Sequence, residues 1–282
     1  MYISLSTHLF VYHDFNSSFI EITRGCGIRN IEVFAVNPHF PYRDERFIDS
    51  ILKSCDSHGV SIRSVHFPLY LHIEDIRRDK WLSLSTEDRE TREKTIAETA
   101  AAAKLLEHSG GGVLVVHGSL PSEERGGKRT FLLIESIHRL LDSVPQGVVV
   151  AIENSTTGSG TARAVMEIAE SFPSDKVGIC IDVGHANVAE SAPSAIASSS
   201  PRLRNVHCSD NYGVEDEHLP PGEGTLNWRK VIKTLGGVSY EGPLTLEIRD
   251  PLRGTIDDTA RFTDPIAKSV RFLEELLEAE SG

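Results

Sequence analysis

The sequence is poor in cysteine and has no pairing pattern for the few cysteines that it contains. Its four cysteines, Cys26, Cys55, Cys180 and Cys208, are scattered over 282 residues and include no Cys-x-x-Cys pair. This arrangement indicates neither a disulfide framework nor a zinc-thiolate site. We expect buried, reduced thiols, as in a cytoplasmic protein.

Membrane signals are also missing. No apolar run reaches the about 20 residues that a membrane-spanning helix needs. The chain starts with the strand-like Met1-Tyr-Ile-Ser-Leu5, without the charged and apolar segments of a secretory signal. The sequence therefore predicts no association with a membrane and a cytoplasmic location.

Positive charge is the third deficit. The 29 Lys and Arg residues are outnumbered by 41 Asp and Glu residues, which gives a formal net charge of −12. Such a chain repels polyanions and shows no basic tail, so a nucleic acid is not an expected partner. The turn Pro221-Gly-Glu-Gly224 also lacks the Lys-Ser/Thr ending of a phosphate-binding loop.

What the sequence does contain is a regular alternation of short apolar runs and longer helix-period segments. The runs are rich in β-branched residues and nearly continuous, as parallel strands buried on both faces should be. The clearest are Val60–Val65, Gly112–Val116, Val148–Ile152 and Val177–Ile181. The strands are expected to end near Ser6, Phe34, His66, His117, Glu153, Asp182, His207 and Glu247.

Helical periodicity fills the intervals between these strands. Helices are expected over residues 19–24, 45–58, 89–108, 131–142, 162–171, 228–235 and 265–278, with a Ser-, Ala- and Pro-rich segment at 191–200 in the sixth place. Eight strand–helix repeats predict an α/β protein, a single-domain (β/α)8 TIM barrel over residues 1–282. Two connections, 67–88 and 209–227, are long enough to be functional loops.

Polar residues recur at the ends of the predicted strands. A metal-competent side chain closes seven of the apolar runs: Glu32, His66, His117, Glu153, Asp182, His207 and Glu247. In a parallel barrel the carboxyl ends of all strands open on one face, so these side chains should converge. A charge at a buried strand end is costly unless it is paired or binds a metal. The pattern therefore predicts a divalent metal site at the mouth of the barrel, with Glu32 at the rim either in contact with the substrate or as a salt-bridge partner.

Two local spacings extend the predicted site. His185 follows Asp182 by three residues, and Asp216 and His218 lie in the second long loop. His72, in the first long loop, is a further candidate for contact with a substrate. Mixed imidazole and carboxylate ligands suit Zn, Mn, Fe or Co, with Mg also considered.

Several stretches of the chain resemble the xylose isomerase-like TIM barrel superfamily, which includes sugar phosphate isomerases and epimerases and nucleases of the endonuclease IV type. They are Ile31-Glu-Val-Phe34, Ser64-Val-His-Phe-Pro68, Ile152-Glu-Asn154, Ile181-Asp-Val-Gly-His-Ala-Asn187, Val206-His-Cys-Ser-Asp-Asn211, Asp216-Glu-His-Leu-Pro-Pro-Gly-Glu-Gly-Thr225 and Leu246-Glu-Ile-Arg249. The resemblance covers nearly the whole chain.

The resemblance implies two alternative activities. In the isomerase and epimerase branch, one metal is held by the matches to Glu153, Asp182, His207 and Glu247, and the two glutamates exchange protons with a sugar through a metal-stabilised enediolate. In the nuclease branch, three zinc ions that cleave abasic DNA are held by residues that match His66, His117, Glu153, Asp182, His185, His207, Asp216, His218 and Glu247. All nine positions carry compatible residues here.

The acidic net charge favours the first alternative, a small-molecule sugar, sugar acid or sugar phosphate as substrate. A phosphate would need a cation near the mouth, for which Arg249 and Arg253 are candidates. The loop 67–88, with Tyr70, His72 and Trp81, is expected to close over the site. In epimerases a basic residue often follows the seventh-strand motif, whereas this chain has Tyr212 there, so the exact sugar stays open.

Overall fold

Eight parallel strands close into a barrel in the computed structural model, which describes residues 1–118, 127–156, 160–256 and 258–281. Each strand pairs with the next one in the chain, and the first pairs with the last. The strands are β1 (Tyr2–Ser6), β2 (Asn30–Phe34), β3 (Ser61–His66), β4 (Gly112–His117), β5 (Val148–Glu153), β6 (Val177–Asp182), β7 (Leu203–Cys208) and β8 (Pro243–Leu246). The predicted TIM barrel is confirmed.

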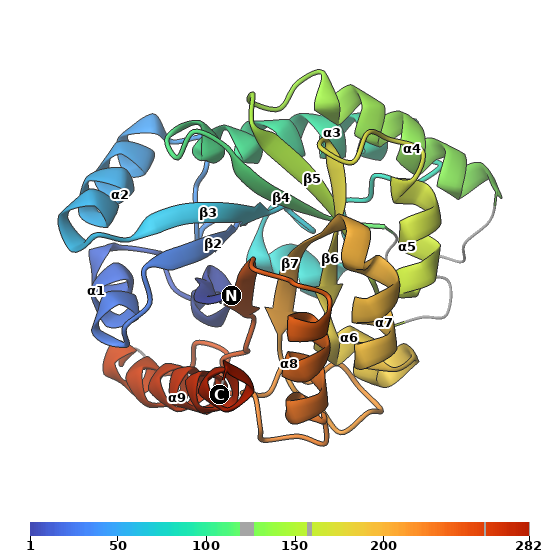
Figure 1. Ribbon diagram of the computed structural model, residues 1–282. Coiled ribbons are helices and arrows are strands. Elements are labelled where there is room, and N and C mark those ends of the chain that lie inside the picture. The colour runs from blue at the N-terminus through green and yellow to red at the C-terminus, as the bar shows by residue number, and fades with distance from the viewer. Residues whose placement is uncertain (119–126, 157–159, 257, 282) are drawn as a thin grey trace.

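The helices form a ring around the barrel (Figure 1). They are α1 (Ser17–Gly25), α2 (Glu45–His58), α3 (Arg89–Ala103), α4 (Gly127–Leu141), α5 (Ala162–Ala169), α6 (Val183–Ala189), α7 (Ala192–Ser199), α8 (Trp228–Gly237) and α9 (Thr263–Ser281). Short 3-10 helices are η1 (Thr7–Phe10), η2 (Ile73–Arg78), η3 (Lys104–Glu107), η5 (Ser200–Arg202) and η6 (Thr259–Phe262). In the described parts of the chain, no helix is both long and apolar enough to cross a bilayer.

Local signals in the sequence set the helix ends. The Asp44 carboxylate accepts hydrogen bonds from the backbone N–H groups of Arg46 and Phe47 and so caps α2. Gly59, with φ of 63°, ends the same helix in the left-handed conformation that glycine adopts at low cost. Ile51 and Cys55 face the barrel from this helix and are buried in the main core.

One departure from the expected elements concerns the region after β6. The segment 191–200 forms α7, but it is preceded by the short helix α6, which the sequence pattern did not predict. Asp182 is both the last residue of β6 and the cap of α6, because its carboxylate accepts a hydrogen bond from the N–H of His185. The helix therefore begins directly after the strand, and this hydrogen bond holds Asp182 and His185 close together.

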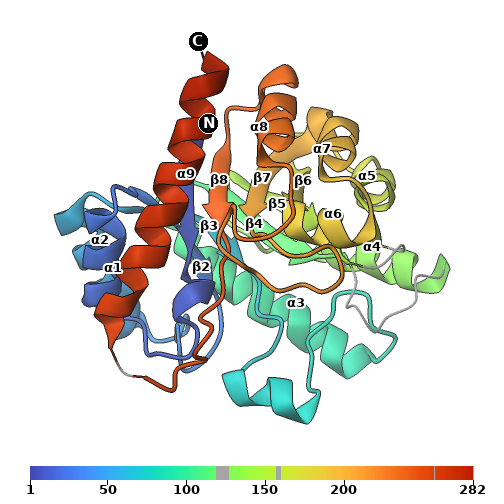
Figure 2. The same ribbon diagram turned by 90° about the horizontal axis from the view of Figure 1, so that it is seen from below.

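The carboxyl ends of the strands open on one side of the barrel. Figure 2 shows the connections that follow β3, β7 and β8 gathered on this side, at the bottom of the view. Segments from the beginning, middle and end of the chain thus surround one mouth. Six of the seven expected side chains lie at or within one residue of a strand end: His66, His117, Glu153, Asp182, His207 and Glu247.

Candidate metal centre

Three groups of imidazole and carboxylate side chains lie at the mouth of the barrel. Within each group, one ligand atom of every residue lies within 4.8 Å of those of the others. The groups are Glu153, Asp182, His207 and Glu247; His66, His117 and Glu153; and His185, Asp216 and His218. All nine residues that the resemblance singled out are therefore brought together, and Glu153 belongs to two of the groups.

The first group, hereafter the quartet, is almost inaccessible to solvent. His207 Nδ1 lies 3.1 Å from Glu153 Oε1 and 2.9 Å from Glu247 Oε2, and all three side chains are buried. Asp182 Oδ1 accepts the N–H of His185 at 2.8 Å, whereas its Oδ2 is buried and has no hydrogen-bond partner among the described residues. A buried carboxylate oxygen is costly without a partner. A cation at this point would supply that partner, so the quartet fits a divalent metal.

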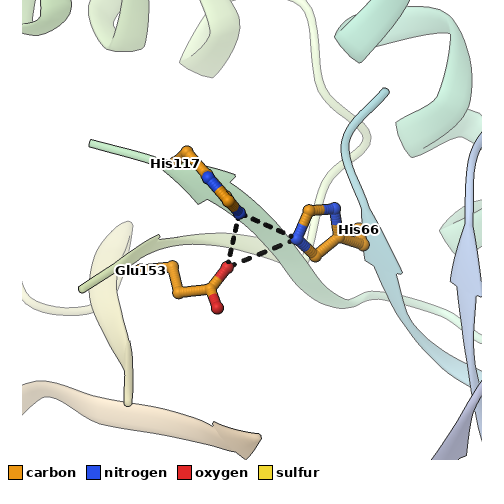
Figure 3. Close-up of side chains that lie close together, drawn as sticks. All are labelled: His66, His117 and Glu153. Atoms are coloured by element: carbon orange, nitrogen blue, oxygen red, sulfur yellow. Dashed lines mark hydrogen bonds and ion pairs between the residues drawn. The ribbon is translucent and has the colours of Figure 1, made fainter. Parts of the chain in front are cut away.

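The second group is shown in Figure 3, where two imidazoles and one carboxylate point at the same spot. His66 Nε2 and His117 Nε2 lie 3.2 Å apart, and they are 3.3 Å and 3.0 Å from Glu153 Oε2. Each ring comes from the last residue of its strand, β3 or β4, and the carboxylate comes from the last residue of β5.

The third group joins α6 to the loop between β7 and α8. Asp216 Oδ2 lies 3.3 Å from His185 Nε2 and 2.9 Å from His218 Nε2, and its Oδ1 is buried without a hydrogen-bond partner in the described structure. Asp210 shapes this loop, since its carboxylate accepts the N–H groups of Gly222 and Leu226 and the indole N–H of Trp228. The turn Pro221–Gly224 thus has a structural role in holding Asp216 and His218 at the mouth.

Main-chain carbonyls set the tautomers of three of these histidines. The Nδ1 atoms of His66, His185 and His218 lie 3.0, 3.0 and 2.8 Å from the carbonyl oxygens of Phe67, Asn154 and Glu247. A carbonyl oxygen only accepts, so Nδ1 carries the proton in each ring. In the neutral form of each ring, Nε2 presents its lone pair to its group, which is the arrangement that metal-binding histidines use.

Glu32 occupies a different place from the one expected. We expected it at the rim of the mouth, in contact with substrate, but it is fully buried and does not line the cavity described below. Its Oε1 lies 3.0 Å from His207 Nε2, and its Oε2 accepts a hydrogen bond of 2.8 Å from Asn205 Nδ2. Glu32 therefore orients His207 from beneath, with Nδ1 of the ring directed at the quartet. The sequence analysis did not identify the role of Asn205.

The electrostatics of the quartet favour ionised carboxylates next to charged imidazoles. Burial by itself would raise the pKa of Glu153, but His117 and His207 hold it well below its usual range. Burial by itself would lower the pKa of His207, but the carboxylates around it, Glu247 and Glu32 among them, raise it well above its usual range. Burial raises the pKa of Asp182 to about 6. Because imidazole binds a metal only when neutral, a bound cation would replace these protons.

A cavity of about 630 Å³ opens above the three groups. Its floor is formed by members of the groups, and one wall is apolar, with the last residue of β2 and residues from the loops after β1 and β3: Val11, Tyr12, Phe34, Leu69, Tyr70, Ile76 and Trp81. Arg249 and Arg253, from the loop after β8, also line it. The volume is within the range of pockets that hold small molecules.

Two residues differ from expectation around this cavity. His72 does not line it: the side chain is exposed at the start of η2, where the backbone N–H donates to Asp75. His8, which the sequence analysis overlooked, does line it, and its ring packs at 4.8 Å from Phe34 and 5.2 Å from His218. His8 follows the end of β1 by two residues, so the rule of polar residues after strand ends would have found it.

Comparison with known protein sequences gives one family model and two partial relatives. The model described as a xylose isomerase-like TIM barrel matches residues 20–276. An uncharacterized protein from Methanocaldococcus jannaschii is 32% identical over 121 residues, which are 38% of this chain and 40% of that protein. An uncharacterized protein from Sinorhizobium fredii is 30% identical over 124 residues, 41% of this chain and 40% of that protein. The similarity thus spans about two fifths of each relative.

Solved structures match over almost the whole chain. A D-tagatose 3-epimerase-like protein has a TM-score of 0.80 at 22% identity, with 100% of this chain and 98% of that one covered. The IolI protein with a bound zinc atom has a TM-score of 0.77 at 16% identity, with 99% of each chain covered. L-ribulose 3-epimerase has a TM-score of 0.75 at 16% identity, with 100% and 96% covered. At such identities the likeness establishes the fold.

Proposed function

Because the chain belongs to the xylose isomerase-like TIM barrel family, we propose that it is a divalent-metal-dependent isomerase or epimerase of a small sugar or sugar derivative. The observation that carries the proposal is the quartet, Glu153, Asp182, His207 and Glu247, of which Glu153 and Glu247 line the cavity, with an unpartnered oxygen on the buried Asp182. The structural likeness to sugar 3-epimerases supports the same choice of substrate class.

The quartet would hold the metal through its four side chains. When bound, a divalent cation supplies Lewis-acid polarisation of a substrate carbonyl and stabilises the negative charge that develops on its oxygen. Zn, Mn, Co, Fe and Mg are all compatible with two or three carboxylates and one imidazole.

Glu153 and Glu247 would transfer protons to and from the substrate. Both carboxylates line the cavity, and their pKa values are held below the usual range although burial opposes this, so each is available as a base at neutral pH. One removes the proton next to the substrate carbonyl and becomes the carboxylic acid, which leaves an enediolate. The other, protonated from solvent, returns a proton on the opposite face for epimerisation or to the neighbouring carbon for isomerisation.

The remaining polar residues of the mouth would orient the sugar. His66, His117 and His185 line the cavity, with ring nitrogens 3.3, 3.0 and 3.5 Å from the Glu153 carboxylate, and would form hydrogen bonds with sugar hydroxyl groups next to the reacting carbon. The aromatic wall around Tyr70 and Trp81 would exclude water from the enediolate.

Exchange of substrate hydrogen with deuterium oxide tests this proposal directly. The protein, loaded with Mn²⁺ or Zn²⁺, is incubated with a panel of ketoses, and the carbon-bound hydrogens next to the carbonyl are followed by NMR. We expect exchange at one carbon of at least one sugar, lost in Glu153→Gln and retained in Glu278→Gln, a change of an exposed glutamate on α9. Exchange at equal rates in the Glu153→Gln protein would refute the proposed role.

A second candidate function is metal-dependent cleavage of a phosphodiester, such as that of abasic DNA. The observation in its favour is the presence of the two further groups, His66, His117 and Glu153, and His185, Asp216 and His218, next to the quartet. In this alternative they would hold two more cations, and a hydroxide would attack phosphorus.

Metal content and one substrate distinguish the two candidates. One metal ion per chain together with sugar exchange supports the isomerase, whereas three ions per chain together with cleavage of an oligonucleotide that contains one abasic site supports the phosphodiesterase. The formal net charge of −12 disfavours a polyanionic substrate and is the reason for ranking this candidate second.

A further inference from the structure

Arg249 and Arg253 stand out because they are cations at the mouth that have no carboxylate partner among the described residues. Both line the cavity, and in the described parts of the chain neither guanidinium forms a hydrogen bond or an ion pair. By contrast, Arg261 in the nearby helix η6 forms a bidentate ion pair with the Asp250 carboxylate. Because the protein has an excess of acidic residues that could have paired with them, two arginines left without such a pair at one cavity indicate a binding site for an anion.

The strand direction places Arg249 on the side of the catalytic carboxylate. Side chains alternate along extended backbone, so residues two apart share a face. Glu247 and Arg249 line the cavity, whereas Ile248 between them is buried in the main core. The backbone N–H of Arg249 donates to the carbonyl of His218 at 3.0 Å, which joins this position to the loop that carries the third group.

The turn after Arg249 is organised by Asp250. Its buried carboxylate accepts the N–H groups of Leu252 and Gly254, at 2.9 and 2.8 Å, and both oxygens are paired with Arg261. Its charge is therefore neutralised within the turn. Asp250 acts as a positioning residue that holds the turn without cancelling the charges of Arg249 and Arg253.

The same turn bends Arg253 toward the mouth at a conformational cost. Arg253 has φ of 46°, in the left-handed region that side chains other than glycine rarely adopt, and Gly254 follows with φ of 73°. A side chain on Gly254 would meet the Cβ of Tyr12 at 2.6 Å, so the turn packs closely against another residue of the cavity lining. Such strain persists where the surrounding structure enforces it, often at ligand sites.

Other charges at the cavity are already engaged. Burial and the neighbours His218 and Arg249 lower the pKa of His8 to about 3, with Glu247 opposing, so this imidazole is neutral. Asp79, which also lines the cavity, accepts the indole N–H of Trp81. The floor carboxylates belong to the metal groups. The two arginines are thus the cations left for a ligand among the described residues of the lining.

We propose that Arg249 and Arg253 bind a terminal phosphate or carboxylate of the substrate, which makes the substrate an acidic sugar derivative rather than a neutral sugar. This inference rests on the proposed isomerase or epimerase function and narrows its substrate class. Guanidinium groups bind both anions through paired N–H donors, and the apolar wall offers nothing comparable to an anion. The sugar would lie with its carbonyl at the quartet and its charged end at the loop after β8.

Calorimetric titration with three ketoses that differ only at carbon 6 tests the inference: D-fructose, D-fructose 6-phosphate and D-fructuronate. The protein is loaded with Mn²⁺. We expect at least one of the two acidic compounds to bind about 10-fold or more tightly than D-fructose, because charge-assisted hydrogen bonds are stronger than neutral ones. The comparison of the two acids tells a phosphate site from a carboxylate site.

Variants separate the arginines from the metal, which could itself hold an anion. In Arg249→Gln, Arg253→Gln and the double variant, the preference for the acid should fall at least about 10-fold while the affinity for D-fructose stays within about 2-fold. Arg46→Gln, on the exposed face of α2, should keep the preference. Arg253 is exposed, so its variant is expected to fold, and thermal unfolding by circular dichroism verifies this.

The outcomes bear differently on the two proposals. Equal binding of all three compounds, or a preference that survives in the double variant, overturns the anion site whatever the sugar chemistry. Loss of the preference in the variants, without deuterium exchange in any sugar, keeps the anion site and counts against the isomerase function. Loss of preference together with exchange in an acidic sugar supports both.

Discussion

At the scale of single residues, the site depends most on Glu153. Its Oε1 lies 3.1 Å from His207 Nδ1 in the quartet, and its Oε2 lies 3.0 Å from His117 Nε2 in the neighbouring group. One side chain therefore links two sets of ligands, and a change there should affect chemistry more than fold. Glu247 Oε2 contacts the same nitrogen, His207 Nδ1, at 2.9 Å.

Glu153→Gln and Glu247→Gln should each lower kcat about 100-fold to 10,000-fold, because each removes a group that transfers a proton. The amide keeps the volume of the side chain, so far-ultraviolet circular dichroism should be unchanged. Turnover of the best acidic or neutral ketose is the measurement. Wild-type kcat in either variant would remove that glutamate from the mechanism.

Glu32→Gln tests a residue that acts through another. The Glu32 carboxylate lies 3.0 Å from His207 Nε2 as an ion pair and orients the ring so that Nδ1 faces Glu153 and Glu247, so its loss should weaken metal binding about 10-fold to 100-fold. Competition with a chelator gives the metal affinity. The control is Glu98→Gln. Glu98 accepts hydrogen bonds from Tyr42 and Arg43 outside the mouth, so this change should leave the metal affinity unchanged.

At the scale of elements, the loop after β8 decides how the arginines are presented. Gly254→Ala should destabilise the protein by more than about 1 kcal/mol, since alanine is strained at a positive φ, and should disturb the packing on Tyr12. The affinity for the preferred acidic ketose should also fall in the Gly254→Ala protein. Gly25→Ala, at the end of α1 with open space around it, should change neither quantity appreciably. Unchanged stability and binding in Gly254→Ala would contradict the described turn.

The connection between β2 and α2 predicts a dependence of stability on pH. His39 is fully buried there, with its ring nitrogens near His13 O and Thr7 Oγ1, and burial lowers its pKa to about 4 from 6.5. Between these values the unfolded chain binds the proton and the folded chain does not. Stability is therefore undiminished above about pH 6.5 and falls as pH drops toward 4.

The shift of His39 corresponds to a loss of up to about 3 kcal/mol over that window, at about 1.4 kcal/mol per unit. Urea unfolding at pH 7 and pH 4.5 measures it. His39→Gln should lower stability at pH 7 but reduce the difference between the two pH values. An unchanged difference in this variant would mean that other groups produce it.

The limits of what the sequence could predict are also clearest at the level of elements. The apolar runs identified the strands, because parallel strands buried on both faces leave an almost continuous pattern. Helix α6 was missed, since seven residues after a strand give too few turns for a periodicity. Glu32 is buried rather than at the rim, because it lies two residues, or roughly 7 Å, before the end of β2 at Phe34, an end that the sequence did predict.

At the scale of the whole molecule, closure of the barrel is what assembles the site. The nine potential ligands span residues 66 to 247, yet they meet because all strands are parallel and in chain order. Their convergence could be predicted from the fold alone. The apolar wall, the role of Asn205 and the presentation of Arg253 could not, because they depend on strand register and on loop conformations that no local pattern specifies.

Metal analysis combined with anomalous X-ray scattering tests the central claim most directly. Crystals of the metal-loaded protein should show a cation between Glu153, Asp182, His207 and Glu247, with ligand distances of about 2.0–2.3 Å, and a chelator should remove it and lower the Tm. Absence of any bound divalent metal would contradict the proposed metal site. So would a metal-loaded crystal with no anomalous peak between these four side chains.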